Sequence, residues 1–248
     1  MVVSIHQPNL FPWMGLFHKI SHSERFVVFD HVQAPQGKSW LTRSKIILNE
    51  EPRWLTLPIH RVSLQKIVDI QINYETNFVR KHLGTLRQAY GKTEYFDQAF
   101  PLVEEVYSQK FKYLVDFNLM TIRTFSERMN LSTEFLRSSE VLKEEDTLDG
   151  IKGNDLVLRL CQICGGSSYI SGTGCLDFIR PEEFVKGDVQ FQFQNFICPE
   201  YPQVNCPSFV PAMSILDAVF NVGFAGVEAL LEAPMLLSPE QYHELSKV

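Results

Sequence analysis

The stretch of sequence that decides the fold is VVSIHQPN, residues 2–9. Its first five residues, VVSIH, are mostly apolar and β-branched, which predicts a strand. Proline at position 8 lacks a backbone donor and asparagine at position 9 favours a turn, so the strand ends in a loop. After Pro12, apolar residues recur at helical spacing from Trp13 to Ile20, which predicts a helix.

Further strands and a block of helices follow this opening. Residues 25–32 are apolar on both faces in their first half, as expected of a central strand that helices cover on both sides. The aromatic and β-branched stretches 38–47 and 53–59 predict two strands joined by a turn, and the period-two pattern of residues 67–72 predicts an edge strand. Helical periodicity dominates from about 77 to 130, where we expect three helices.

Strands and helices alternate again after residue 130. Strands are predicted at 133–137, 168–171 and 189–196, and helices at 154–164, at 214–220 and after a capping box that starts at residue 238. This alternation predicts a Rossmann-like α/β fold, in which helices flank a mainly parallel sheet, over a single domain of residues 1–248 with a helical insertion. Ligands of such sheets bind at the carboxyl ends of strands.

Composition narrows the class of protein. The chain has 248 residues, of which 45% are apolar, and its net charge is −6. An acidic chain without a basic block is not expected to bind nucleic acid. No apolar run reaches the roughly 18 residues of a membrane span, and the amino terminus lacks a secretion signal, so we expect no membrane insertion.

The five cysteines have no disulfide framework spacing, which favours a reducing, cytoplasmic location. Cys161 and Cys164 are three residues apart in a predicted helix, but no second pair stands at ligand spacing, so no metal site is predicted. The oligomeric state is open.

Candidate catalytic side chains follow the first two predicted strands. His6 lies at the end of the first strand beside a helix start, where an imidazole and the amides of Gln7 and Asn9 can orient an anionic substrate. His18 faces the same loop if the helix is suitably rotated. Asp30 is an acid at the second strand end. The alternative is structural, with His6 hydrogen-bonded to the backbone.

A cationic and aromatic stretch comes next. Arg43 and Lys45 point the same way on a strand and can bind a carboxylate or phosphate, and Trp40 offers a stacking face. A solvated surface strand is an equal alternative. The other substrate-binding candidates are Trp13, Gln33, Ser171, Gly172, Thr173, Asp217 and Asn221.

Two groups of these candidates, residues 171–174 and the pair Asp217 and Asn221, have features that suit ligand binding. Glycines in residues 171–174 allow a close backbone approach, so that successive N–H groups can cradle an anion, although neither a Walker loop nor a dinucleotide pattern is present. Asp217 and Asn221 are four residues apart and share one helix face, from which both can point into a cleft or cap a neighbouring element.

Several motifs occur in order along nearly the whole chain. They are His6-Gln7-Pro8-Asn9 with Pro12-Trp13 and Gly15, Phe29-Asp30-His31-Val32-Gln33, Ser39-Trp40-Leu41-Thr42-Arg43, Trp54-Leu55-Thr56-Leu57-Pro58, Ser171-Gly172-Thr173-Gly174, Tyr201-Pro202-Gln203 and Ser214-Ile215-Leu216-Asp217. In this order they resemble the WbqC-like family. The resemblance implies that the protein takes part in bacterial surface-polysaccharide and O-antigen biosynthesis. It also implies that the protein is a glycine transferase that acts on an amino sugar.

The chain also departs from the pattern of that family. His31 stands where a second acid is common, Ser44 where asparagine is common, and Leu176 and Phe178 where tyrosine is frequent. These departures leave the substrate open.

A weaker similarity is to nucleotidylyltransferase-like folds, although their His-x-Gly-His motif is missing. It implies that ATP activates a carboxylate that is then passed to an amine. In that scheme His6 and His18 contact a phosphate or acyl donor, Arg43 and Lys45 hold an anionic group, and Asp30 receives a proton from the attacking amine.

Two functions therefore stay open. The first is an acyl or aminoacyl transferase with a pocket lined by His6, Asp30 and Arg43, and with ATP or an activated acyl donor as its unidentified co-substrate. The alternative is a non-catalytic sugar-nucleotide-binding or scaffold protein, which predicts exposed aromatics at Trp13, Trp40 and Trp54. Either way, the expected partner is a small molecule or sugar nucleotide.

Overall fold

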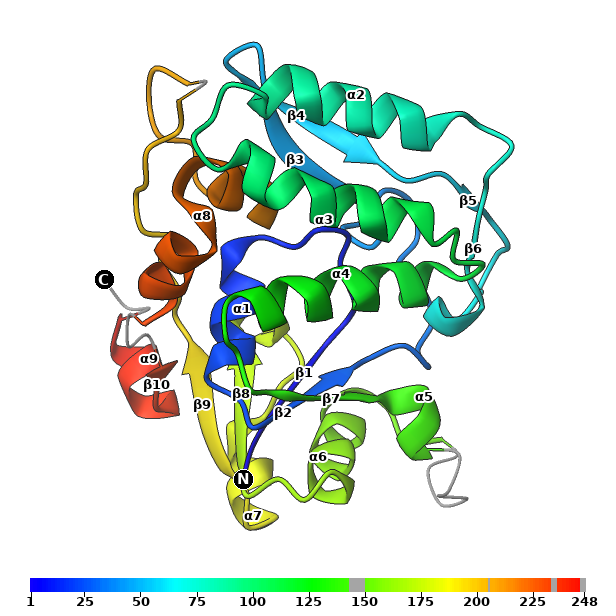
Figure 1. The fold of residues 1–248 in the computed structure, drawn as a ribbon. Coiled ribbons are helices and arrows are strands. Elements are labelled where there is room, and N and C mark those ends of the chain that lie inside the picture. The colour runs from blue at the N-terminus through cyan, green and yellow to red at the C-terminus, as the bar shows by residue number, and fades with distance from the viewer. Residues whose placement is uncertain (143–149, 205, 233–235, 246–248) are drawn as a thin grey trace.

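A six-stranded sheet organises the protein (Figure 1), whose computed structural model describes residues 1–142, 150–204, 206–232 and 236–245. The strand order is β10-β9-β8-β1-β2-β7. All neighbours are parallel except β10, which is antiparallel to β9. The bounds are β1 Val2–His6, β2 Arg25–Val28, β7 Glu134–Arg137, β8 Ser168–Gly172, β9 Gln190–Gln194 and β10 Leu236–Leu237. The predicted α/β fold with a mainly parallel sheet is confirmed.

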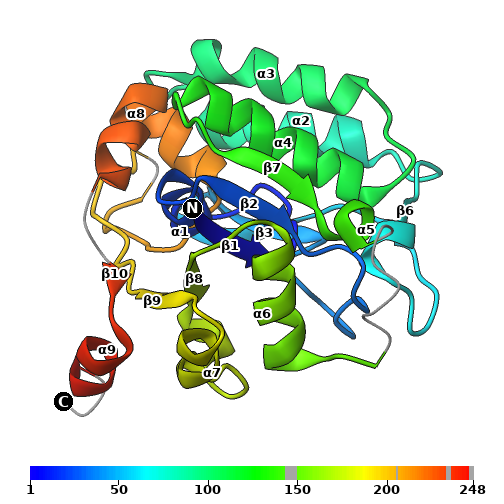
Figure 2. The same cartoon turned by 90° about the horizontal axis from the view of Figure 1, so that it is seen from below.

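Helices cover both faces of the sheet (Figure 2). One layer contains α1 Met14–Ser21, α2 Phe78–Tyr90, α3 Phe96–Ser108, α4 Leu114–Arg128 and α8 Ile215–Leu231. The opposite layer contains α6 Gly153–Ile163 and α7 Pro181–Lys186. Two short helices, α5 Ser138–Val141 and α9 Pro239–Leu245, lie at the periphery. The helices predicted between about 77 and 130 are therefore present as α2, α3 and α4.

Alternation of side chains along the central strands separates two apolar clusters. Phe26 and Val28 of β2 pack into the larger cluster beneath α1, α4 and α8, whereas Val27 packs into the smaller cluster with α6. Val3 and Ile5 of β1 also face α6. A strand buried on both faces needs apolar residues at consecutive positions, which explains the continuous run in β2.

Two small antiparallel pairs lie outside the main sheet. The first joins β3 Arg43–Leu48 to β4 Glu51–Thr56. Its two turn residues, Asn49 and Glu50, both have positive φ, which matches the twist of a two-residue hairpin. The second joins β5 Ile59–His60 to β6 Gln71–Ile72.

Several predicted strands are shorter than expected, among them the strand at 189–196, of which β9 covers Gln190–Gln194. The second strand ends at Val28 rather than residue 32, and residues 38–42 are not part of a strand. The predicted edge strand at 67–72 is a 3-10 turn, η1 Ile67–Asp69, followed by the two-residue β6. Ile67 and Ile70 are both buried and are three residues apart, which is the spacing of a 3-10 turn. The strand begins only after this turn.

Local signals at helix ends are confirmed. Ser214 caps α8, since its Oγ accepts a hydrogen bond from the N–H of Leu216 at 3.3 Å. Ser238 and Gln241 form the predicted capping box before α9, with side chain to backbone distances of 2.8 and 3.3 Å. No helix in the described part of the chain is long and apolar enough to cross a membrane.

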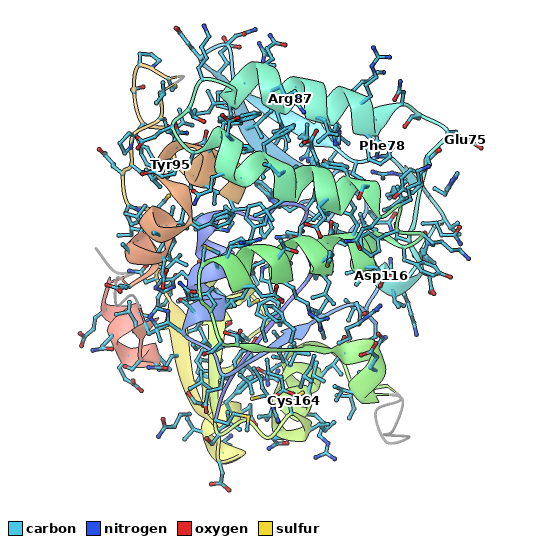
Figure 3. The ribbon with its side chains drawn as sticks, viewed as in Figure 1. Glu75, Phe78, Arg87, Tyr95, Asp116 and Cys164 are labelled. Carbon is cyan, nitrogen blue, oxygen red and sulfur yellow. The ribbon has the colours of Figure 1, made fainter. Side chains whose placement is uncertain are left out.

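Gly223 breaks the regular course of α8. Its φ is 70°, and a Cβ at this position would lie 2.6 Å from the ring of Tyr95. Tyr95 lies beside α8 (Figure 3), so glycine allows both the left-handed backbone and the close approach of this ring.

Buried His82 makes the stability of the fold sensitive to acid. Its Nδ1 accepts from the hydroxyl of Tyr107 at 2.8 Å and its Nε2–H donates to the carbonyl of Thr56 at 3.0 Å, and burial lowers its pKa to about 4. Because unfolded histidine protonates near pH 6.5, stability is lost as pH falls from 6.5 towards 4, by about 3 kcal/mol at pH 4. Urea unfolding at pH 7 and pH 4 measures this loss of stability, which should be about 3 kcal/mol smaller in His82→Gln than in the natural protein. Equal losses in the variant and the natural protein would contradict this role of His82.

Candidate functional site

Two adjoining pockets open where strands of the main sheet end. The inner pocket, of about 200 Å³, is lined by His6, Trp13, Lys19, Gly172, Thr173, Gly174 and Gln194, with neighbours on α1 and after β9. The outer pocket, of about 540 Å³, is lined by His6, Gln7, Asn9, Trp13, Lys38, Ser39, Trp40 and Ala212, among others. His6 and Trp13 line both, so the pockets adjoin at these two side chains, and we call the two pockets together the hollow. Its position is the one expected for a ligand of a parallel sheet.

Lys19 supplies the positive charge of the inner pocket. Only 3% of its surface is exposed, and its ammonium group has no ion-pair or hydrogen-bond partner among the described residues. Burial lowers its pKa to about 8, so it remains mostly charged at pH 7. A buried cation without a counter-ion costs free energy that a bound anion would recover.

Gly172 makes room for this ammonium group. A Cβ on Gly172 would lie 3.2 Å from Lys19 Nζ, closer than ordinary van der Waals contact. The charge of Lys19 therefore rests against the carboxyl end of β8, beside Thr173.

His6 is held as a neutral proton acceptor. Its Nδ1 lies 2.7 Å from the carbonyl oxygen of Gln7, and a carbonyl only accepts, so the ring proton is on Nδ1 and Nε2 carries a lone pair. Burial, and then the charge of Lys19, lower the pKa of His6 to about 4. An anion bound at Lys19 would offset that second effect and make Nε2 a stronger base.

Trp13 forms the wall shared by the two pockets. It precedes α1 in an extended conformation, and its indole lies back over Gly15, where a Cβ would overlap the ring. Phe196 packs edge-on against it, with ring centroids 5.6 Å apart. Gly15, which has no side chain, therefore allows the Trp13 ring to lie this close to the backbone.

His18 lines neither pocket. It is fully buried, its Nδ1 lies 2.9 Å from Nε2 of Gln194, and its ring packs on Phe196 and His22. The orientation of α1 brings the next residue, Lys19, into the inner pocket instead.

Asp30 also lies outside both pockets, and we correct the expectation that it meets His6. It is fully buried, and its two oxygens accept from Nε of Arg137 at 2.8 Å, from the hydroxyls of Ser138 and Ser139, and from the N–H of Ser139. Arg137 also pairs with Asp116 at the start of α4 (Figure 3). With all its hydrogen-bonding capacity used, Asp30 joins the ends of β2 and β7.

Trp40, Arg43 and Lys45 come together at the edge of the outer pocket. The Arg43 guanidinium carbon lies 4.0 Å from the ring centroid of Trp54, and Lys45 Nζ lies 5.7 Å from that of Trp40. Trp40 lines the outer pocket, whereas Arg43 and Lys45 do not. The predicted pocket with His6, Asp30 and Arg43 on one wall is therefore not formed.

The remaining candidates divide between the hollow and the protein interior. Gln7 and Asn9 line the outer pocket, and Gly172 and Thr173 line the inner one. Ser171 is buried with its hydroxyl 3.2 Å from the Gly172 carbonyl.

Gln33, Asp217 and Asn221 lie away from the hollow. Gln33 is exposed and bridges to the backbone of Lys66. Asp217 accepts hydrogen bonds from the hydroxyls of Tyr90 and Tyr201 and from the amide of Gln203. Asn221 accepts from the N–H of Val204 and donates to the backbone of Asp217. The pair thus holds α8 to the segment at 201–204.

Lys19 and Gln194 are site residues that the sequence-based candidates lack. The signal for Lys19 is a lysine next to His18, in a helical stretch that is apolar from Trp13 to Phe17. Gln194 gives no such signal, because its Nε2 donates to the Gly15 carbonyl at 2.6 Å only once β9 lies beside α1. Among the described residues, no three His, Cys, Asp or Glu side chains gather as metal ligands do.

Comparison with known proteins places the chain in a family. An uncharacterized protein of Mycobacterium tuberculosis (strain ATCC 25618 / H37Rv) is 25% identical over 227 residues, which are 89% of this chain and 94% of that protein. No solved structure matches the chain significantly. The model of the WbqC-like protein family matches residues 7–229. The chain therefore belongs to the WbqC-like protein family.

Proposed function

We propose that the protein transfers an acyl or aminoacyl group, such as glycyl, to the amine of an amino sugar in bacterial surface-polysaccharide biosynthesis. The observation that carries this proposal is the ammonium of Lys19, which has no hydrogen-bond or ion-pair partner among the described residues and lines one pocket with the neutral imidazole of His6. We assign the reaction to the cytoplasm, because all five cysteines are free, as in a reducing compartment.

The two groups suit the charge changes of amide formation. The amine nitrogen attacks the carbonyl carbon of the activated donor, a new C–N bond forms, and the amine proton passes to Nε2 of His6. The carbonyl oxygen becomes an oxyanion, which the ammonium of Lys19 stabilises. As the carbonyl re-forms, the bond to the phosphate or thiolate leaving group breaks, and that group takes the electron pair and the proton held by His6.

The sizes of the two pockets support an assignment of the two substrates. The inner pocket, at about 200 Å³, fits a small acyl group, whereas the outer pocket, at about 540 Å³, fits a sugar. Their shared wall at His6 is where donor carbonyl and acceptor amine would meet. Trp13 and Trp40 supply flat apolar surfaces in the outer pocket.

The alternative of a non-catalytic sugar-nucleotide-binding protein is favoured by one observation. Trp40 and Trp54 are each 42% exposed, as expected of a recognition surface, whereas Trp13, the third expected aromatic, is partly buried. Binding without turnover would require only this aromatic surface and would not need Lys19 or His6.

The test supplies the purified protein with an amino-sugar nucleotide and with either ATP plus glycine or an acyl thioester. We expect an acylated sugar by mass spectrometry, together with AMP, ADP or free thiol. Lys19→Met should form no product. The control Lys92→Met changes an exposed lysine in the loop after α2 and should retain full activity. Tight binding of the sugar nucleotide without product from any donor would support the binding protein instead.

A further inference from the structure

We propose that the acceptor sugar arrives as a nucleoside diphosphate sugar, and that a surface beside the outer pocket binds its nucleoside diphosphate. This surface, the tryptophan rim, consists of Trp40, Arg43, Lys45 and Trp54. The inference rests on the proposed function in one respect, which is that the sugar is the acceptor of the acyl group. Binding of a nucleotide at the rim does not itself require acyl transfer.

The rim presents two adjacent indole rings to solvent. The ring centroids of Trp40 and Trp54 lie 5.1 Å apart at an interplanar angle of 62°, and each residue is 42% exposed. Large aromatic rings left exposed side by side offer stacking faces to a flat ligand, and every nucleobase has such a face.

Two uncompensated cations accompany these rings. Arg43 lies over Trp54 at 4.0 Å, and Lys45 Nζ lies 5.7 and 5.3 Å from the centroids of Trp40 and Trp54. Neither Arg43 nor Lys45 is in any of the ion pairs found among the described residues. In a chain of net charge −6, two unpaired cations beside aromatic rings fit a diphosphate attached to a base.

The facing strand adds no acid to this surface. Arg43 is opposite Thr56 and Lys45 is opposite Trp54 in the β3–β4 register, so the cross-strand neighbours are a hydroxyl and an indole. A diphosphate on this face would meet donors without like-charge repulsion.

The rim leads into the outer pocket. Trp40 belongs to both, and Lys38 adds a third cation to the pocket wall. The N–H of Leu10 donates to the Trp40 carbonyl at 2.9 Å, and the N–H of Ser214 donates to the Lys45 carbonyl at 2.8 Å. These backbone bonds fix the rim against the loop after β1 and the start of α8, so a sugar attached to a diphosphate at the rim would extend towards His6.

Titration calorimetry on the full chain tests the rim with UDP, GDP, inorganic pyrophosphate and farnesyl diphosphate. We expect at least one nucleotide to bind about tenfold tighter than pyrophosphate, because base stacking adds to the phosphate contacts. Trp40→Ala should remove that difference. Lys45→Met should weaken nucleotide and pyrophosphate alike and reduce the salt dependence, and Lys92→Met should change nothing.

The inference is overturned if pyrophosphate binds as tightly as both nucleotides, or if a folded Trp40→Ala keeps the nucleotide preference. Tightest binding of farnesyl diphosphate would also overturn it and would indicate a lipid-linked sugar. Transfer to a free amino sugar without nucleotide binding would reject the rim alone. Nucleotide binding that depends on Trp40, without transfer to any sugar, would reject the proposed function alone.

Discussion

Replacing Lys19 by methionine should stabilise the protein while abolishing transfer. Burial lowers the pKa of Lys19 from 10.5 to about 8, so at pH 7 the folded state bears the cost of a charged ammonium that no described residue pairs with. Because one pKa unit corresponds to about 1.4 kcal/mol, we expect the free energy of unfolding to rise by about 3 kcal/mol in Lys19→Met. Methionine keeps the apolar stem and removes the charge.

The gain in stability of Lys19→Met should decrease as the pH rises. The cost of the charged lysine is present in full below about pH 8 and disappears as pH rises to 10.5, where the unfolded chain also loses its proton. Urea unfolding should therefore show the advantage of the variant shrinking between pH 8 and pH 10.5. A destabilised Lys19→Met, or a Lys92→Met control with the same gain, would contradict this account.

Stabilisation at the expense of activity is typical of a residue retained for function. If Lys19→Met is both more stable and fully active, Lys19 has no part in transfer and the proposed oxyanion role is rejected. The urea unfolding measurement also shows whether an inactive Lys19→Met is folded, which separates loss of the ammonium group from loss of structure.

The second large effect is expected for His6→Gln. Glutamine can keep the hydrogen bond to the Gln7 carbonyl but cannot accept the amine proton, so kcat should fall by roughly 10²–10⁴-fold with little change in KM for the sugar. His22→Gln is the matched control, because His22 lies at the end of α1 and lines neither pocket. Steady-state kinetics of the three proteins provide the measurement.

The pH profile separates catalysis from positioning. In the natural protein kcat/KM should be level from about pH 4, the pKa of His6, to about pH 8, the pKa of Lys19, and fall outside this window. The residual activity of His6→Gln should lack the acid limb. Unchanged kcat together with a retained acid limb would remove His6 from the chemistry.

Local sequence patterns predicted most of the elements correctly. The strand at residues 2–6 and the helices α4 and α6 follow from apolar periodicity, and the start of α8 follows from its Ser214 cap. The helix predicted at 214–220 is shorter than α8, which continues to Leu231. Residues 67–72 were harder, because their apolar spacing is shared by a tight turn and a short strand. Such short segments are decided by what they pack against rather than by their own period.

The site was only half predictable. His6, Gln7 and Asn9 line the hollow because a parallel strand exposes its end to the ligand edge of the sheet. Asp30 ends a strand in the same way, yet the neighbouring β7 supplies Arg137 and Ser138, which bury and saturate its carboxylate. No pattern near residue 30 records which strand will lie next to it.

Sequence alone is therefore sufficient for the α/β architecture, the family and the strand end that opens onto a pocket, since each depends on residues close together along the chain. The choice of Lys19 over His18, and of His6 over Asp30, required the fold. Those choices depend on the rotation of α1 against β8 and on the pairing of β2 with β7, which are contacts between residues far apart in sequence.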